Sequence, residues 1–182
     1  MSLVQTIGPQ EGLPRETGAS IYTLINATWP PKPGTRTTTL DETLAKWKRW
    51  ESAHFVITAD GRNSGEVLAH ALIFRRDVIT PQGPLGVGAL AKVCVHPDHR
   101  GRGWGADVVR AAFASLPALG VSVSLFQTGV PPFYEKLGGR LVTNRFVNGD
   151  SQDNPFWDAC EMIYPAEFDW PAGQIDLNGP GY

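Results

Sequence analysis

The residues whose types and spacing could do chemistry lie in one short stretch, RGRGWG, in which Gly101, Gly103 and Gly105 take every second position. An apolar run ends just before it and an amphipathic helix follows at once. The first N–H groups of a helix have no intrahelical partner, and the helix dipole adds partial positive charge there, so an anion can bind. Glycine lets a phosphate approach without meeting a Cβ, and Arg100 and Arg102 add charge. The stretch predicts a pyrophosphate site; the alternative is a tight turn with no ligand.

Two nucleotide chemistries could use such a site. The letters GRGWGA fit the dinucleotide fingerprint, with Gly101, Gly103 and Ala106 in its three places. That fingerprint also expects an acidic residue roughly 20 positions further on to hold the ribose. No Asp or Glu occurs between Asp107 and Glu135, so the nicotinamide interpretation loses its second support. A P-loop is excluded because the chain has no Gly-Lys-Ser or Gly-Lys-Thr.

The elements that must position this stretch alternate between helices and strands. Helical periodicity with a capping box from Thr39 to Glu42 predicts one helix, and the apolar face of Val109 and Ala112 predicts another directly after the glycines. The remaining elements are expected as helices over 13–28 and 131–137, strands over 54–59, 66–74, 85–95, 121–126 and 159–164, and a hairpin turn over 60–65. Strands outnumber helices, which favours an α/β (α+β mixed) class: a mixed sheet flanked by helices.

Composition bounds the function. The 182 residues are 42% hydrophobic, which suits one domain over 1–182. A net charge of −2 with no basic stripe argues against nucleic acid as a partner. No leader segment and no apolar run near the roughly 20 residues of a membrane helix is present, so we expect a cytoplasmic protein with no membrane partner. Of the two cysteines, Cys94 lies in an apolar run and is expected to be a buried structural thiol.

Two motifs together resemble the GNAT superfamily of N-acetyltransferases. The stretch VCVHPDHRGRGWG is similar to its motif A, Q/R-x-x-G-x-G/A, with Arg100, Gly103 and Gly105 in the specified places. The stretch QTGVPPFYEKLGGR is similar to its second landmark, a helix with Phe-Tyr-Glu-Lys-x-Gly about 30 residues later. The resemblance covers residues 54–141 well, the helices before them loosely, and the tail after about Asn144 hardly at all.

The resemblance implies a fold and a reaction. The fold would be a mixed, mainly antiparallel sheet whose central parallel strands, 85–95 and 121–126, splay apart to admit the pantetheine arm, with a core over about 54–164 and a tail over 165–182. The reaction would transfer the acetyl group of acetyl-CoA, a co-substrate, to a primary amine of a small molecule by direct attack in a ternary complex. A homodimer would also be common in this family. No metal is expected, because His96 and His99 lie on a turn without further ligands.

The resemblance also implies site residues. Tyr134 stands where the family has the tyrosine that protonates the leaving thiolate; the alternative is a helix residue packing on the sheet beside Phe133. The implied CoA-binding positions are Val93, Cys94, Val95, Arg100, Gly101, Arg102, Gly103, Trp104, Gly105, Ala106, Gln127 and Phe133.

The chain departs from the family pattern at three places. Gln127 replaces a common Asn, Gly139 replaces a common aromatic residue, and the segment around Ala89 lacks the carboxylate of some relatives. The general base therefore stays open among His54, Glu66, His70 and a water chain.

The loop over 148–158 is the candidate acceptor region. Its acidic and aromatic residues, Asp150, Asp153, Asp158, Phe156 and Trp157, suit a cationic amine held against an aromatic face; the alternative is a solvated loop. Two other classes remain open, a CoA-binding regulatory module without turnover and a binding protein for another phosphate or dinucleotide. The tail is either an ordered cap or a frayed end.

Overall fold

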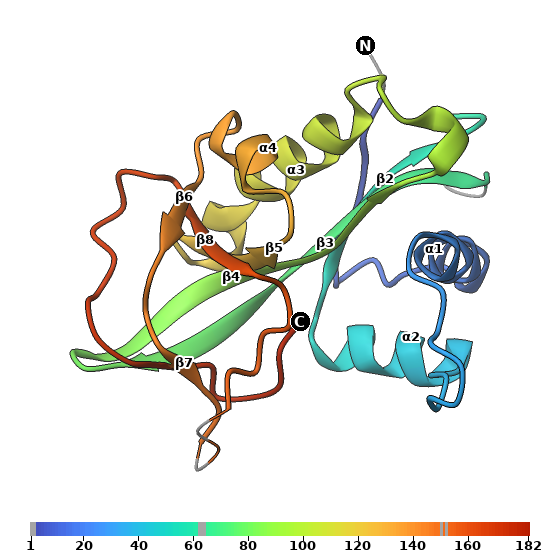
Figure 1. The fold of residues 1–182 in the computed structure, drawn as a ribbon. Coiled ribbons are helices and arrows are strands. Elements are labelled where there is room, and N and C mark those ends of the chain that lie inside the picture. Colours follow the sequence, from blue (N-terminus) through green and yellow to red (C-terminus); the bar gives the residue numbers. More distant parts are fainter. Residues whose placement is uncertain (1–2, 62–64, 150, 152) are drawn as a thin grey trace. The chain divides into compact units, whose positions relative to one another are not determined.

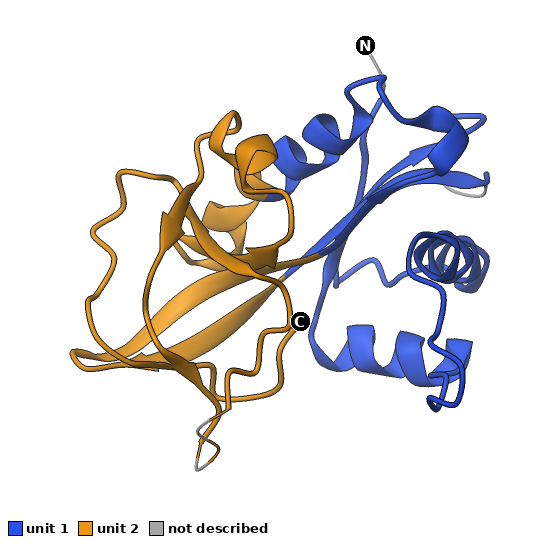
Figure 2. Ribbon diagram, in the orientation of Figure 1, with its two compact units in different colours: residues 1–73, 92–112 blue, residues 74–91, 113–182 orange. Residues whose placement is uncertain are grey.

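Residues 3–61, 65–149, 151 and 153–182 are described in the computed structural model of the chain. Their contacts group the chain into two units, one of residues 1–73 and 92–112 (unit 1) and one of residues 74–91 and 113–182 (unit 2; Figure 2). Strands β3 and β4 and helix α3 contribute residues to both. The single domain expected over 1–182 stays a prediction.

The elements follow in chain order (Figure 1). Helices are α1 (Arg15–Thr28), α2 (Leu40–Arg49), α3 (Trp104–Ala114) and α4 (Pro131–Glu135), with short 3-10 helices at Pro97–His99 and Leu116–Leu119. Strands are β1 (Gln5–Ile7), β2 (Ala53–Thr58), β3 (Val67–Thr80), β4 (Gly83–Val95), β5 (Ser124–Thr128), β6 (Arg140–Val142), β7 (Phe146–Val147), β8 (Cys160–Tyr164) and β9 (Ile175–Asp176).

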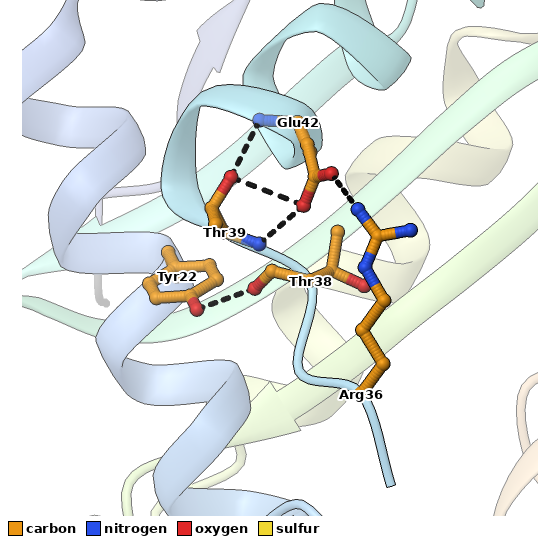
Figure 3. Close-up of polar contacts among 5 residues, drawn as sticks. All are labelled: Tyr22, Arg36, Thr38, Thr39 and Glu42. Atoms are coloured by element: carbon orange, nitrogen blue, oxygen red, sulfur yellow. Dashed lines mark hydrogen bonds and ion pairs between the residues drawn. The ribbon is translucent and has the colours of Figure 1, made fainter.

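Unit 1 is built on β2 and the first half of β3, which are buried on both faces. Strand β2 pairs antiparallel with β1 and with β3, and all six of its residues are buried. Helices α1 and α2 lie on one side of these strands and the first turns of α3 on the other (Figure 1). Helix α2 begins with the predicted capping box: Thr39 Oγ1 accepts from the Glu42 N–H, and a Glu42 carboxylate oxygen accepts from the Thr39 N–H (Figure 3). Nearby, the Tyr22 hydroxyl donates to the Thr38 carbonyl (Figure 3).

Unit 2 holds the parallel pair. Strand β4 pairs with β5 in parallel at Gly88–Ser124 and Ala89–Leu125, and the Ser124 hydroxyl donates to the Gly88 carbonyl at 2.7 Å. Strand β8 pairs antiparallel with β5 and with β6. The mixed, mainly antiparallel sheet with flanking helices is therefore confirmed, including its predicted parallel pair.

The tail of unit 2 is an ordered cap, not a frayed end. Strand β9 pairs with β3 at Ile79 and in parallel with β7, and the Asp176 carboxylate accepts from the Gly149 N–H. The last residue, Tyr182, is 3% exposed; its hydroxyl donates to the Leu125 carbonyl at 3.0 Å, and its ring meets those of Phe74 and Phe156 edge-on.

The strand expected over 121–126 begins later, at Ser124. Gly120 is left-handed, with φ of 67°, and the Val121 N–H donates back to the Leu116 carbonyl. These backbone groups close the preceding turn and are not available to a strand ladder. Strands β1 and β9 were not expected, because they have only three and two residues and no alternating pattern. The expected hairpin turn lies partly at 62–64, outside the described residues.

The buried Tyr182 hydroxyl gives a stability prediction. We expect Tyr182→Phe to lower the free energy of unfolding by about 1 kcal/mol, because a buried hydrogen bond is lost, and Tm by roughly 2–4 °C. Differential scanning calorimetry measures both. The matched control is Tyr22→Phe, whose hydroxyl bond to Thr38 is solvent-exposed and can be replaced by water. Equal effects of the two substitutions would contradict the prediction.

Candidate functional site

The turn that leads into α3 has the backbone that the glycine spacing predicts. Gly101 and Gly103 are left-handed, with φ of 78° and 82°, whereas Gly105 lies in the helix. A Cβ added at Gly101 or Gly103 would meet no other atom within 4 Å. Glycine is therefore needed for conformation, and the turn opens onto free space. The N–H groups of residues 104–106 start the helix, so an anion can complete their hydrogen bonding.

Charged and aromatic side chains surround this turn. The exposed Arg100 donates from Nε to the Val95 carbonyl at 3.4 Å, which joins the turn to the end of β4. The Arg102 guanidinium lies 5.4 Å from the Trp104 ring centroid, and His99 stacks on the same ring at 5.5 Å. Two cations beside free helix N–H groups fit a pyrophosphate in both charge and donor type.

Strand β4 leads into the turn through Val93, Cys94 and Val95. Cys94 is 5% exposed, and burial raises the pKa of its thiol to about 12. A thiol with that pKa is not a nucleophile at neutral pH, so the expected structural cysteine is confirmed. Lys92, which directly precedes Val93, has φ of 53°, an uncommon backbone conformation for a residue other than glycine inside a strand.

A buried histidine pair lies behind Lys92. His70 Nδ1 is 2.9 Å from the Lys92 carbonyl oxygen, and His70 Nε2 is 3.1 Å from His54 Nδ1. Because a carbonyl can only accept, His70 carries its proton on Nδ1, and His54 donates to Nε2. Burial lowers the pKa of His54 to about 4 and that of His70 well below 6.5, so both rings are neutral at pH 7. Both nitrogens of His70 are engaged, which excludes it as a general base. Glu66, a further candidate, is exposed.

Tyr134, in unit 2, is 6% exposed on α4. Its ring centroid lies 4.7 Å from that of Phe126 and 4.8 Å from that of Phe133. The neighbouring Gly139 is explained by close packing, since a Cβ there would lie 3.2 Å from the carbonyl oxygens of Ile163 and Tyr134. An aromatic residue would not fit. The proton-donor role of Tyr134 and the CoA contact of Phe133 stay predictions.

Gln127 has a use that sequence reasoning missed. Its Oε1 accepts from the N–H groups of Trp157 and Asp158, both at 2.8 Å, and its Nε2 donates to the Tyr182 carbonyl at 2.7 Å. The Gln127 amide thus bonds the loop over 148–158, called the acidic loop below, and the end of the tail to β5. Because these partners of Gln127 lie 30 to 55 residues away in the chain, no local sequence pattern indicates the bonds. The predicted CoA contact of Gln127 stays a prediction.

The acidic loop keeps one of its two rings on the surface. Trp157 is 63% exposed, whereas Phe156 is 5% exposed and packs against Phe146 and Tyr182. Asp153 and Asp158 are exposed; Asp150 lies outside the described residues. A cation on this loop would therefore meet the face of Trp157 and not that of Phe156. Within the described ranges, no three His, Cys, Asp or Glu residues gather to hold a metal, and no helix has the length and apolarity to cross a membrane.

Residues 19–139 match the sequence model of the acetyltransferase (GNAT) family. No curated protein matches the chain.

Solved structures share the fold. The GNAT family N-acetyltransferase YhbS from Escherichia coli, in complex with CoA, has a TM-score of 0.65 at 16% identity over 97% of this chain and 89% of that chain. An acetyltransferase from Trypanosoma brucei has a TM-score of 0.59 at 19% identity over 78% and 95%. A probable N-acyltransferase from Enterococcus faecalis has a TM-score of 0.60 at 16% identity over 77% of this chain; the match spans only 32% of that longer chain.

The histidine pair predicts a pH dependence of stability. Because the pKa of folded His54 is about 4 and the unfolded value is about 6.5, the unfolded state binds more protons between these values. Stability is therefore lost as the pH falls through this window. We expect His54 to contribute a loss of about 2 kcal/mol between pH 7 and pH 5.

His54→Asn isolates this contribution, because it keeps a donor at the Nδ1 position without a titrating group. Urea unfolding at the two pH values should show a smaller loss in this variant than in the wild type, whereas His96→Asn, outside the pair, should keep the wild-type loss. The same loss in His54→Asn and wild type would show that His54 does not carry the effect.

Proposed function

The chain belongs to the acetyltransferase (GNAT) family, and from this premise we propose that it transfers the acetyl group of acetyl-CoA to a primary amine of a small molecule. The observation that carries the proposal is the left-handed turn at Gly101 and Gly103, which opens the start of α3 to an anion. Its two exposed arginines suit the pyrophosphate of CoA better than a neutral ligand.

The proposal gives each part of the chain one task. The N–H groups of residues 102–106, with Arg100 beside them, hold the pyrophosphate. Main-chain groups of Val93–Val95 bind the pantetheine amides and polarise the thioester carbonyl, as an oxyanion hole does. Bound acetyl-CoA supplies the activated acyl group. Tyr134 holds the proton that the departing sulfur needs.

The amine nitrogen forms a bond to the acetyl carbon while the carbon–sulfur bond breaks. The sulfur leaves with the bonding electrons and takes a proton from the Tyr134 hydroxyl, and the nitrogen loses a proton. A water chain is our proposal for the base, because His70 has no free nitrogen and the pKa of His54, at about 4, makes it a weak base.

A small cationic amine is the proposed acceptor. The exposed ring of Trp157 and the carboxylates of Asp153 and Asp158 offer charge and an aromatic face on one loop. Gln127 supports the role by holding the backbone of this loop in place through two hydrogen bonds.

Ligand-dependent stability tests the nucleotide site. We expect acetyl-CoA and CoA, but not NADH, to raise Tm, since a ligand at 100 times its Kd stabilises by about 2.7 kcal/mol. Gly103→Ala should weaken acetyl-CoA binding at least 10-fold in calorimetry, because it strains the turn and puts a methyl group before the N–H groups. Gly12→Ala is the control, as Gly12 also has positive φ, 72°, and open space around it. Stabilisation by NADH alone would overturn the proposal.

The role of Tyr134 is tested by removal of its hydroxyl. We expect Tyr134→Phe to lower kcat by about 100-fold and to leave the Kd of acetyl-CoA unchanged, because the ring and its packing are retained. Thiol release in a screen of amines measures kcat, and Tyr22→Phe is the control. An unchanged kcat would show that another group protonates the leaving sulfur. Equal losses in kcat and in affinity for acetyl-CoA would show that Tyr134 acts only through packing.

A further inference from the structure

The backbone of β4 turns left-handed at Lys92, with φ of 53°. A side chain in this region costs on the order of 1–3 kcal/mol and persists only where surrounding contacts impose it. The strained residue directly precedes Val93–Val95, the main chain that the proposed reaction uses. The contacts that fix the conformation of Lys92 therefore also influence the orientation of the main chain of Val93–Val95.

Two side chains contact the Lys92 carbonyl: the Cys94 thiol, a weak donor, at 3.7 Å, and the imidazole of His70, which makes the shorter bond. The imidazole of His70 is 0% exposed, and Nδ1–H donates to the carbonyl oxygen at 2.9 Å. This bond, on the buried side of β4, ties the orientation of the peptide between Lys92 and Val93 to the ring of His70.

His54 holds the ring of His70 in turn. Its Nδ1–H donates to His70 Nε2 at 3.1 Å, which requires the His70 proton to stay on Nδ1. The rings stack with centroids 5.4 Å apart, and Trp47 from α2 lies edge-on to His54 at 5.0 Å. These contacts connect His54 on β2 to His70 on β3 and His70 to the Lys92 carbonyl on β4, all within unit 1.

We propose that His70, oriented by His54, is a positioning residue that sets the Lys92 peptide and thereby aims the main chain of Val93–Val95 at the thioester carbonyl. The proposal rests on the proposed function for its effect on catalysis, but its structural part concerns the free protein. Two buried histidines that served only as packing would not need a fixed tautomer.

Three substitutions at His70 separate hydrogen bonding from volume. His70→Asn keeps a donor at the Nδ1 position, His70→Gln moves the amide to the Nε2 position, and His70→Leu removes both. We expect kcat to fall about 10- to 100-fold in the Gln and Leu variants, with KM for acetyl-CoA changed less than 3-fold, and to recover to within about 5-fold of wild type in the Asn variant.

A second readout does not depend on activity. In ligand-free protein, ¹⁵N NMR should show protonated Nδ1 and bare Nε2 for His70, and the amide resonances of Val93 and Cys94 should shift in His70→Leu but much less in His70→Asn. Ile21→Val, in the core-facing side of α1 at 0% exposure and outside the histidine pair, is the control for packing: it should lower Tm without changing kcat or the two amide resonances.

The outcomes separate the two proposals. If the wild type binds no acetyl-CoA, the proposed function fails, while the tautomer and the amide shifts still decide whether His70 sets the Lys92 peptide. If the wild type turns over and folded His70→Gln keeps its kcat, the positioning role is overturned. It is likewise overturned if His70 carries its proton on Nε2, a measurement that needs no variant to fold.

Discussion

A buried carbonyl or N–H group must be hydrogen-bonded. Strand β2 and the first half of β3 are buried on both faces, so a backbone group beside them that lacks a partner in the strand ladder needs one from a side chain. The Lys92 carbonyl accepts from the imidazole of His70 and, at 3.7 Å, from the Cys94 thiol, and the Gly88 carbonyl accepts from the hydroxyl of Ser124. Among the buried polar side chains, His70 and Ser124 bond to the backbone, whereas His54 bonds to His70. This requirement explains why a histidine occupies the otherwise apolar segment 67–74 of β3 and why a second one on β2 is paired with it.

The same requirement shapes unit 2. The Leu125 carbonyl accepts from the hydroxyl of Tyr182, and the amide of Gln127 bonds the loop backbone at Trp157 and Asp158 and the carbonyl of Tyr182. The tail is therefore part of the core of its unit. Any ligand that used the amide of Gln127 would compete with these three bonds, which makes this residue a link between the tail and the proposed acceptor loop.

The proposed function adds a second constraint, since acetyl-CoA carries a pyrophosphate that needs N–H groups without an internal partner. The chain leaves such groups at the start of α3, where the left-handed glycines open the turn and Arg100 and Arg102 supply charge. The protein thus bonds the Lys92 and Gly88 carbonyls with its own side chains, whereas the first N–H groups of α3 have no intrahelical partner and can bind a ligand. Family membership and the chemistry of this turn support the proposed acetyl donor, and the loop over 148–158 supports the proposed amine acceptor.

The sequence by itself determined the features whose physics is local. A positive φ needs glycine, so Gly101 and Gly103 predicted the turn; the capping box predicted the start of α2; and two motifs predicted the family and its mixed sheet. Only the tertiary structure decided which distant groups meet: His54 with His70 and Lys92, Gln127 with Tyr182, and Gly139 beneath β8. These contacts depend on strand register and on packing between elements, because hydrogen bonds act over about 3 Å whereas the partners lie tens of residues apart in the chain.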